Sequence, residues 1–405
     1  MGLFSSNRCT KNIELVCDVG SGSVGISLVD TTCTPPKILF CERIYFTTPR
    51  LNATSEISVV SNELKEALVL ALQHAISQGI KPSHVSCFYS SPWFISQVQV
   101  LKLSHSSPSV FSEEVFEKLV TEGENNFMSS KDASNHTSLE DVKIIERRVT
   151  QVKLNGYQTH NPFGKKSTTA EVSIFVSALS KKSIETIEES INHVFAGLKI
   201  EHHTFVLASG AILRNLFHSN DSFFVFDISD EVTDISLIDN NALFDTMSFP
   251  IGTRSIISRI ESDCKLDYSL AQSALSMYLK NETHEEQNTL IDSSVDSIRK
   301  DWFTQLERSF GGLVKNVAMP PVIYFITDEN MIPFFETLFE KNKSYSQTMS
   351  EYKFQIIPIK NEMFESHVDF SNPAKKDFFL GLEALYLCML SPVKDNIVTS
   401  GYVVE

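Results

Sequence analysis

The segment Val16–Asp30 constrains the fold of this chain more than any other, because it has the pattern strand, glycine turn, strand. Its sequence is V-C-D-V-G-S-G-S-V-G-I-S-L-V-D. Gly20 and Gly22 lie at the turn, where the absence of a side chain permits backbone conformations and close approaches that other residues prevent. The segment therefore predicts a tight β-hairpin whose turn exposes bare N–H groups.

The polar residues of this hairpin suggest what its turn can bind. Ser21 and Ser23 add hydroxyl donors to the backbone N–H groups, and together these can hold a phosphate. Asp18, which directly precedes the turn, can hold Mg²⁺ through water. The alternative is an ordinary Gly/Ser hairpin that binds nothing.

Composition narrows the class of protein. A chain of 405 residues is too long for one simple core and is expected to form two or more subdomains. Its 35 lysines and arginines against 50 acids give a net charge of −15, which disfavours nucleic acid and anionic lipid as main partners. No apolar run approaches the roughly 20 residues of a membrane span. Seven cysteines without a C-x-x-C pair, together with a polar first segment, favour a reduced cytoplasmic protein.

The order of predicted elements indicates an α/β fold that is interrupted once. Apolar runs and turn signals predict three strands, an amphipathic helix at 61–78 and a buried strand at 85–89. A small α+β insert of roughly 110 residues follows, with strands at 95–103, 142–154 and 170–179 and helices at 112–127 and 183–194. The α/β pattern then resumes, with a helix predicted over 203–217 and strands at 223–226, 234–238, 243–249 and 322–327. Helices dominate 254–317, and further helices are predicted at 332–339 and 378–390.

The strand–turn–strand pattern around an aspartate therefore occurs twice, at Asp18 and at Asp227. In this order the elements resemble the actin-like ATPase superfamily, and most closely its FtsA/PilM branch of bacterial proteins. Four motifs carry the resemblance: Asp18-Val-Gly-Ser21; Asn155-Gly-Tyr157 with Asn161-Pro-Phe-Gly164; Phe226-Asp-Ile228 through Thr233-Asp-Ile-Ser236; and Phe249-Pro-Ile-Gly252. Each motif is weak alone, but the ordered set spans nearly the whole chain.

The resemblance implies two actin-like, ribonuclease H-like halves around a cleft, with an inserted SHS2-type subdomain. It places subdomain IA at 1–89 plus 376–405, the insert IC at 90–202, subdomain IIA at 203–253 plus 320–375 and the helical subdomain IIB at 254–319. It also implies that ATP and Mg²⁺, if bound, contact the two hairpins, with Asp18 and Asp227 near the metal. The candidate cofactor-binding residues are Asp18, Gly20, Ser21, Gly22, Ser23, Asp227, Thr233 and Asp234. No catalytic residue is assigned.

The second hairpin departs from the family pattern. The family has D-I-G-G-G-T-T-D, whereas this chain has D-I-S-D-E-V-T-D over 227–234. Ser229, Asp230 and Glu231 replace the three glycines. A carboxylate about 5 Å from a phosphate charge costs about 3 kcal/mol at an effective dielectric near 20, so this hairpin is a poor phosphate cradle.

Two further nucleotide elements are also altered. The family's adenosine loop, an apolar strand followed by T-G-G-G, corresponds here to a strand followed by Asp328-Glu329-Asn330. The A-E-x-x-K set of the helical subdomain corresponds to Ala271-Gln272 with Leu275, so an amide and an alkyl chain replace the glutamate and the lysine. Only the first hairpin keeps the family pattern.

These residues together favour a cytoplasmic actin-like scaffold with weak or lost nucleotide binding, and they disfavour an enzyme. By resemblance it would recruit protein partners for cell division, or for a pilus or secretion platform at the inner membrane. The partners would include a membrane protein's tail, because 391–405 has no amphipathic helix for direct insertion; self-association stays open. The alternatives are a working Mg-ATPase with Asp18 and Asp227 around the metal, and a sugar or acyl kinase, for which no substrate motif is found.

Overall fold

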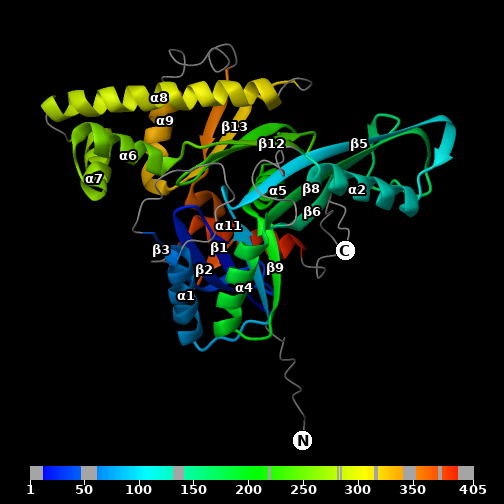
Figure 1. Cartoon of the computed structure of the whole chain (residues 1–405), viewed down its shortest axis with the longest axis horizontal. Helices are drawn as coiled ribbons and strands as arrows, with labels where there is room; N and C mark the ends of the chain where they lie inside the picture. The colour runs from blue at the N-terminus through cyan, green and yellow to red at the C-terminus, as the bar shows by residue number, and fades with distance from the viewer. Residues whose placement is uncertain are drawn as a thin grey trace, which may run out of the picture.

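The computed structural model describes residues 12–46, 62–130, 141–217, 220–280, 282, 285–313, 318–340, 353–372 and 376–390. Two α/β lobes lie one above the other in Figure 1, and a smaller α+β insert projects to the right. The predicted loop at 131–139 and the C-terminal tail at 391–405 lie outside the described residues. None of the described helices is both long enough and apolar enough to cross a membrane.

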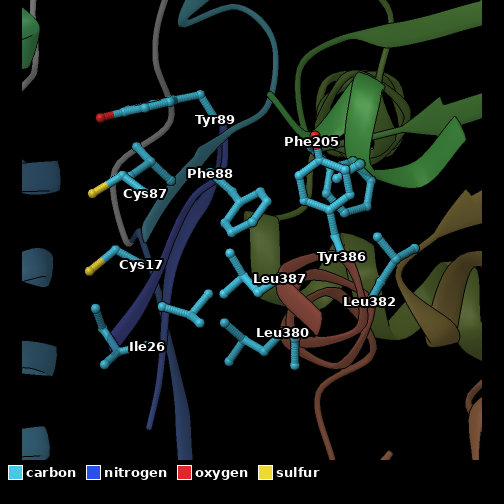
Figure 2. Packing of buried hydrophobic residues seen from close by; sticks show 14 of the residues in the cluster. Cys17, Ile26, Cys87, Phe88, Tyr89, Phe205, Leu380, Leu382, Tyr386 and Leu387 are labelled. Carbon is cyan, nitrogen blue, oxygen red and sulfur yellow. The ribbon is translucent and has the colours of Figure 1, made fainter. Parts of the chain in front are cut away.

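The first lobe is built on a six-stranded sheet. Its strands β1 and β2 form the predicted hairpin, with Asp18 opposite Gly25, and β4 pairs parallel to β1. Helix α1 packs against β2 and β3 with α4 beside it, whereas α11 packs on the opposite face together with α5 (Figure 2). The sheet order is β15 (Asp369–Phe370), β3 (Lys37–Tyr45), β2 (Ser23–Asp30), β1 (Ile13–Val19), β4 (His84–Tyr89) and β9 (Lys199–Thr204). The helices are α1 (Asn62–Ser77), α4 (Lys181–Val194), α5 (Phe205–Leu216) and α11 (Phe378–Leu390).

The second lobe repeats this plan with a five-stranded sheet. Strands β10 and β11 form the second hairpin, and β13 pairs parallel to β10 as β4 does to β1. The long helix α8 packs Trp302 and Phe310 into an aromatic core under this sheet. The sheet order is β12 (Ala242–Phe249), β11 (Thr233–Asp239), β10 (Phe223–Ile228), β13 (Val322–Thr327) and β14 (Gln355–Pro358). The helices are α6 (Thr253–Cys264), α7 (Tyr268–Leu279), α8 (Glu285–Leu313) and α9 (Ile332–Glu340).

The insert is a four-stranded antiparallel sheet with helix α2 on one face. Gly123 of α2 lies so close to the sheet that an added Cβ would be 2.8 Å from Ile174 and 3.0 Å from Leu101. The insert therefore has a core of its own, separate from those of the two lobes. The sheet order is β5 (Phe94–Val110), β8 (Lys166–Ser180), β6 (Val142–Leu154) and β7 (Tyr157–Gln158), and α2 spans Glu113–Met128.

The hydrophobic core of the first lobe extends onto one face of the second sheet. Phe205 of α5 lies at the same core as Leu15 of β1 and Tyr324 of β13. Helix α4 and strand β9, which the sequence assigned to the insert by its bounds of 90–202, also pack on the first lobe. The short strand β15 likewise pairs with β3, so part of the stretch 320–375 contributes to the first sheet.

Strand β9 was not expected from the sequence, which predicted a helix starting at His203. His202 and His203 were interpreted as surface residues, yet both lie on β9 and have buried partners. His202 Nδ1 lies 2.8 Å from the hydroxyl oxygen of Tyr89, and His202 Nε2 lies 2.9 Å from Oε1 of Glu188. His203 Nδ1 lies 3.2 Å from Oε1 of Glu146. The sequence K-I-E-H-H-T lacks strong alternation, so its place at the sheet edge is set by tertiary contacts.

Replacing residues 99–174 with a short Gly-Ser-Gly turn is expected to leave the two lobes folded. Val98 pairs with Phe175, so the ends left by the deletion are already adjacent, and the deleted part holds most of the insert's separate core. Thermal unfolding followed by circular dichroism should show a cooperative transition for the remainder. Loss of cooperative unfolding would contradict the assignment of this segment as a separate module.

Candidate functional site

The first hairpin is a tight turn closed by backbone hydrogen bonds. The N–H of Gly20 donates to the carbonyl of Ser23 at 2.9 Å, and the N–H of Phe46 donates to the carbonyl of Gly22 at 2.9 Å. Ser21 and Ser23 are buried rather than open to solvent. The predicted turn is thus formed, but its hydroxyl groups already have partners within the protein.

Arg43 occupies the acidic side of this hairpin. Its guanidinium group donates to Asp18 at 2.7 Å, to Asp377 at 2.6 Å and to the hydroxyl of Ser23 at 2.9 Å. Arg43 comes from β3, and Asp377 directly precedes α11, where it also accepts from the N–H of Leu380. One buried cation therefore joins the hairpin, the neighbouring strand and the C-terminal helix.

The carboxyl groups near Arg43 differ in how strongly they hold a proton. Burial opposes ionisation of Asp377, but Arg43 and backbone N–H groups lower its pKa below the ordinary value. Glu383 of α11 is fully buried with no hydrogen-bond partner for either oxygen, and burial followed by the charge of Asp18 raises its pKa well above normal. Because Arg43 already faces two carboxylates, we infer that Glu383 is protonated at neutral pH.

Helix α6, which follows strand β12, holds the second hairpin in place. The N–H of Ser229 donates to the carbonyl of Val232 at 3.0 Å. Asp230 accepts from Arg254 Nε at 2.5 Å and from the hydroxyl of Thr253 at 3.4 Å, and backbone bonds run from both residues of α6 to the hairpin. The first turn of α6 is therefore fastened to the hairpin.

The two hairpins touch each other. Ser21 Oγ donates to Ser229 Oγ at 3.3 Å, and the N–H of Glu231 donates to Ser21 Oγ at 3.2 Å. A Cβ added to Gly22 would lie 2.3 Å from an oxygen of Asp230, so the carboxylate rests on the glycine backbone. The space over the first turn is thus filled by a side chain of the second lobe.

Three more carboxyl groups are buried in the cleft. Asp227 and Asp234 lie opposite each other on β10 and β11, and neither oxygen of Asp227 has a partner. Burial, then the charges of Asp234 and Asp18, raise the pKa of Asp227 well above normal. Burial raises the pKa of Asp234 to about 7, although hydrogen bonds from Ser91 oppose this shift. Burial also raises the pKa of Asp328 to about 6, although the positive charge of Arg43 opposes it.

The other predicted nucleotide elements surround the same cleft. Asp328 directly follows β13, and its charge acts on Asp227, on Tyr45 and on Tyr268 at the start of α7. The guanidinium carbon of Arg254 lies over the ring of Tyr268, 5.2 Å from the ring centre, which is within the distance of a cation–π contact. Of these groups, Asp328 belongs to the stretch that the resemblance aligned with the family's adenosine loop, whereas Ala271 and Leu275 of the A-E-x-x-K stretch are buried in the core of the second lobe.

The structure brings most of the predicted residues together. Asp18, the four residues of the first turn, Asp227 and Asp234 all line the junction of the two hairpins. Thr233 differs, because its hydroxyl donates to the carbonyl of Ile251 at 2.7 Å and accepts from Trp302, away from the first hairpin. Within the described part of the chain, no three His, Cys, Asp or Glu side chains are arranged to hold a metal ion.

Sequence reasoning missed the partners of these residues. Arg43 lies in a predicted strand, but nothing in the pattern F-C-E-R-I distinguishes it from a surface charge. Asp377 and Arg254 were likewise passed over, since each lies at a helix start where charged residues are common. No feature of the sequence marked Ser91 as part of this site either.

The residues present do not fit Mg-ATP in this arrangement. Asp18 is bound to Arg43 where a hydrated metal would be expected, and Asp230 covers Gly22 where a phosphate would approach. Both positions hold a protein group of the corresponding charge, a guanidinium for the metal and a carboxylate for the phosphate. The cleft is thus occupied by the protein itself.

Two lobes that each carry a strand–turn–strand around a buried aspartate define the actin-like ATPase fold. Comparison with solved structures agrees: PilM in the PilM–PilN type IV pilus biogenesis complex superposes with a TM-score of 0.59 and 16% identity, covering 93% of this chain and 96% of that chain. A Bacteroides thetaiotaomicron protein with an actin-like ATPase fold and unknown function superposes with a TM-score of 0.44 and 11% identity, covering 93% and 96%. No protein-family model and no curated protein sequence matches. The predicted actin-like fold with a PilM-like relative is thereby confirmed.

Arg43→Met is expected to destabilise the protein by about 3–5 kcal/mol, because it leaves Asp18 and Asp377 buried without a cation. Urea unfolding measures the change. Arg259→Met is the matched control, since its pair with Asp301 is exposed and should contribute at most about 1 kcal/mol. Equal losses in the two variants would contradict the role given to Arg43.

The free energy of unfolding should fall as the pH rises from about 4 to 7. In the unfolded chain Asp234 has the ordinary aspartate pKa of 3.8, whereas in the folded protein burial raises this pKa to about 7. The folded state therefore binds more protons in this window, and stability decreases by at most about 4 kcal/mol. Asp234→Asn should flatten this part of the profile, whereas Asp301→Asn on the surface of α8 should not. Parallel profiles for Asp234→Asn and the parent protein would contradict the burial of this proton.

Proposed function

We propose that this chain is an actin-like scaffold of the FtsA/PilM type, with weak or lost nucleotide binding. One observation carries the proposal: Arg43 and Asp230 fill the positions beside Asp18 and Gly22 that metal and phosphate would need. A cleft closed by its own side chains does not require ATP to hold its lobes together. The protein then acts by presenting surfaces to partners, not by a chemical step.

The similarity to PilM supports a role in assembly, since that protein was solved in a complex with PilN. By analogy this chain recruits protein partners for a pilus or secretion platform or for cell division, at the inner face of the membrane. Contact with a membrane protein's tail would keep it cytoplasmic and peripheral. These roles are proposals that the fold alone does not decide.

The insert is the part that we propose to contact partners. At its far end, the Asn155-Gly156 turn is held by hydrogen bonds from Thr168 and Thr169 to the Asn155 side chain. Tyr157, next to this turn, is 79% exposed. Tyrosine is one of the residues that most often contribute a large share of the binding energy at protein interfaces, and a turn fixed by hydrogen bonds would present it at a low cost in entropy.

A working Mg-ATPase is the second candidate. The first hairpin keeps its glycines and serines, and Asp227 has no hydrogen-bond partner that would prevent it from meeting a cation. This function would require Arg43 to leave Asp18 and Asp230 to leave Gly22, so that the two lobes separate.

Titration of Mg-ATP decides between the two candidates. The parent protein should bind ATP weakly or not at all, and the double variant Asp230→Gly, Glu231→Gly should bind at least about tenfold more tightly, since it restores the glycine cradle and removes two carboxylates. The double variant Asn240→Gly, Asn241→Gly is the matched control, because both positions have positive φ and lie in another turn of the same lobe. Phosphate release by the parent protein that disappears in Asp18→Ala would establish the ATPase instead.

A further inference from the structure

The chain passes between the two hairpins where it leaves the first lobe for the insert. Residues 90–93 join β4 to β5, and Ser90, Ser91 and Trp93 are buried. The N–H of Ser90 donates to the carbonyl of Val19 at 3.2 Å, and the indole N–H of Trp93 donates to the carbonyl of Gly20 at 2.8 Å. One side of this connection is thus attached to the first hairpin.

The other side is attached to the second hairpin. Ser91 Oγ donates to Asp234 Oδ1 at 2.8 Å, and both groups are buried. Ser91 and Trp93 are two residues apart, so one short stretch of chain bonds to both lobes at the point where the lobes meet.

This stretch is continuous with the insert. Phe94 begins β5 directly after Trp93 and pairs with Leu179 of β8, so Trp93 is fixed to the first rung of the insert's sheet. Strand β12 of the second lobe also packs against β5 and β6. In Figure 1, β5 extends from the junction of the lobes to the far end of the insert. A movement of the insert is therefore transmitted along a strand to residues 91–93.

We propose that Ser91 and Trp93 couple the position of the insert to the closure of the two lobes, so that an event at the insert opens or closes the cleft without nucleotide. The inference rests on the proposed scaffold role, in which partner contact at the insert takes the place of nucleotide as the controlling event. By linkage the coupling acts in both directions: loosening the hairpins also loosens the first residues of β5.

Native-state amide hydrogen exchange without ATP tests the coupling. The reporters are hydrogen-bonded amides at the junction, namely those of Gly20, Phe46, Ser229 and Glu231. Ser91→Ala and Trp93→Phe each remove one hydrogen bond, so these amides should exchange about fivefold to tenfold faster in each variant.

Two matched controls separate coupling from general destabilisation. Ser86→Ala removes a buried serine–carboxylate bond to Glu14 within the first lobe, and Tyr324→Phe removes a hydrogen bond of a buried aromatic to Asn220. Neither should change exchange at the junction. If the controls accelerate the four reporters as much as Ser91→Ala and Trp93→Phe do, the proposal is overturned.

The reverse direction uses Ser21→Ala, which removes the bonds to Ser229 and Glu231 without adding bulk. The amide of Trp93, which donates to Ser90, should then exchange faster, while that of Asn155 at the far turn should not. An unchanged Trp93 amide would overturn the coupling. Phosphate release that disappears in Asp18→Ala would overturn the scaffold role, but it would leave these exchange rates, measured without ATP, as they are, so the two failures can be told apart.

Discussion

The arrangement of the first lobe depends on one buried guanidinium group. Arg43 lies between Asp18 and Asp377, so a single charge fastens the first hairpin to the C-terminal helix across a gap of more than 300 residues in sequence. Buried charges are stable only when they are paired, and a third carboxyl group nearby must then stay protonated. Glu383 meets that condition. The position of α11 and the orientation of Asp18 are therefore consequences of one interaction, whereas burial and then the charge of Asp18 raise the pKa of Glu383.

The second lobe uses the same device, an arginine of a neighbouring element paired with a carboxylate of the hairpin. There the fixed group at the hairpin tip is a carboxylate, Asp230, and α6 supplies the cation, Arg254. Asp230 reaches the first hairpin at Gly22, next to Ser23, whose hydroxyl accepts from Arg43. The family pattern associates these two hairpins with a phosphate and a metal ion. In this chain a carboxylate and a guanidinium group of the protein itself lie at the corresponding positions.

The periodic parts of the chain could be predicted from sequence, and the long-range parts could not. Alternation and caps are local, so the hairpin at Asp18, helix α1 and the buried strand at Val322–Thr327 were recognised within a few residues of their bounds. Strand β9 was missed because its sheet position is set by β4, more than a hundred residues earlier. The acidic tip of the second hairpin was recognised from the sequence as unsuited to phosphate. The role of Arg43 could not be predicted, because the sequence around a charged residue in a strand does not indicate which residue it will pair with.

Gly22 and Asp230 limit which sequences this fold can accept. The glycine belongs to one lobe and the carboxylate to the other, yet there is no room for a Cβ between them. Any larger residue at position 22 requires a smaller one at position 230, and a smaller residue at 230 leaves Arg254 without its partner. The two loops are separated by about two hundred residues, yet a substitution in one requires a compensating substitution in the other. Each lobe therefore limits which residues the other lobe can accept at this contact.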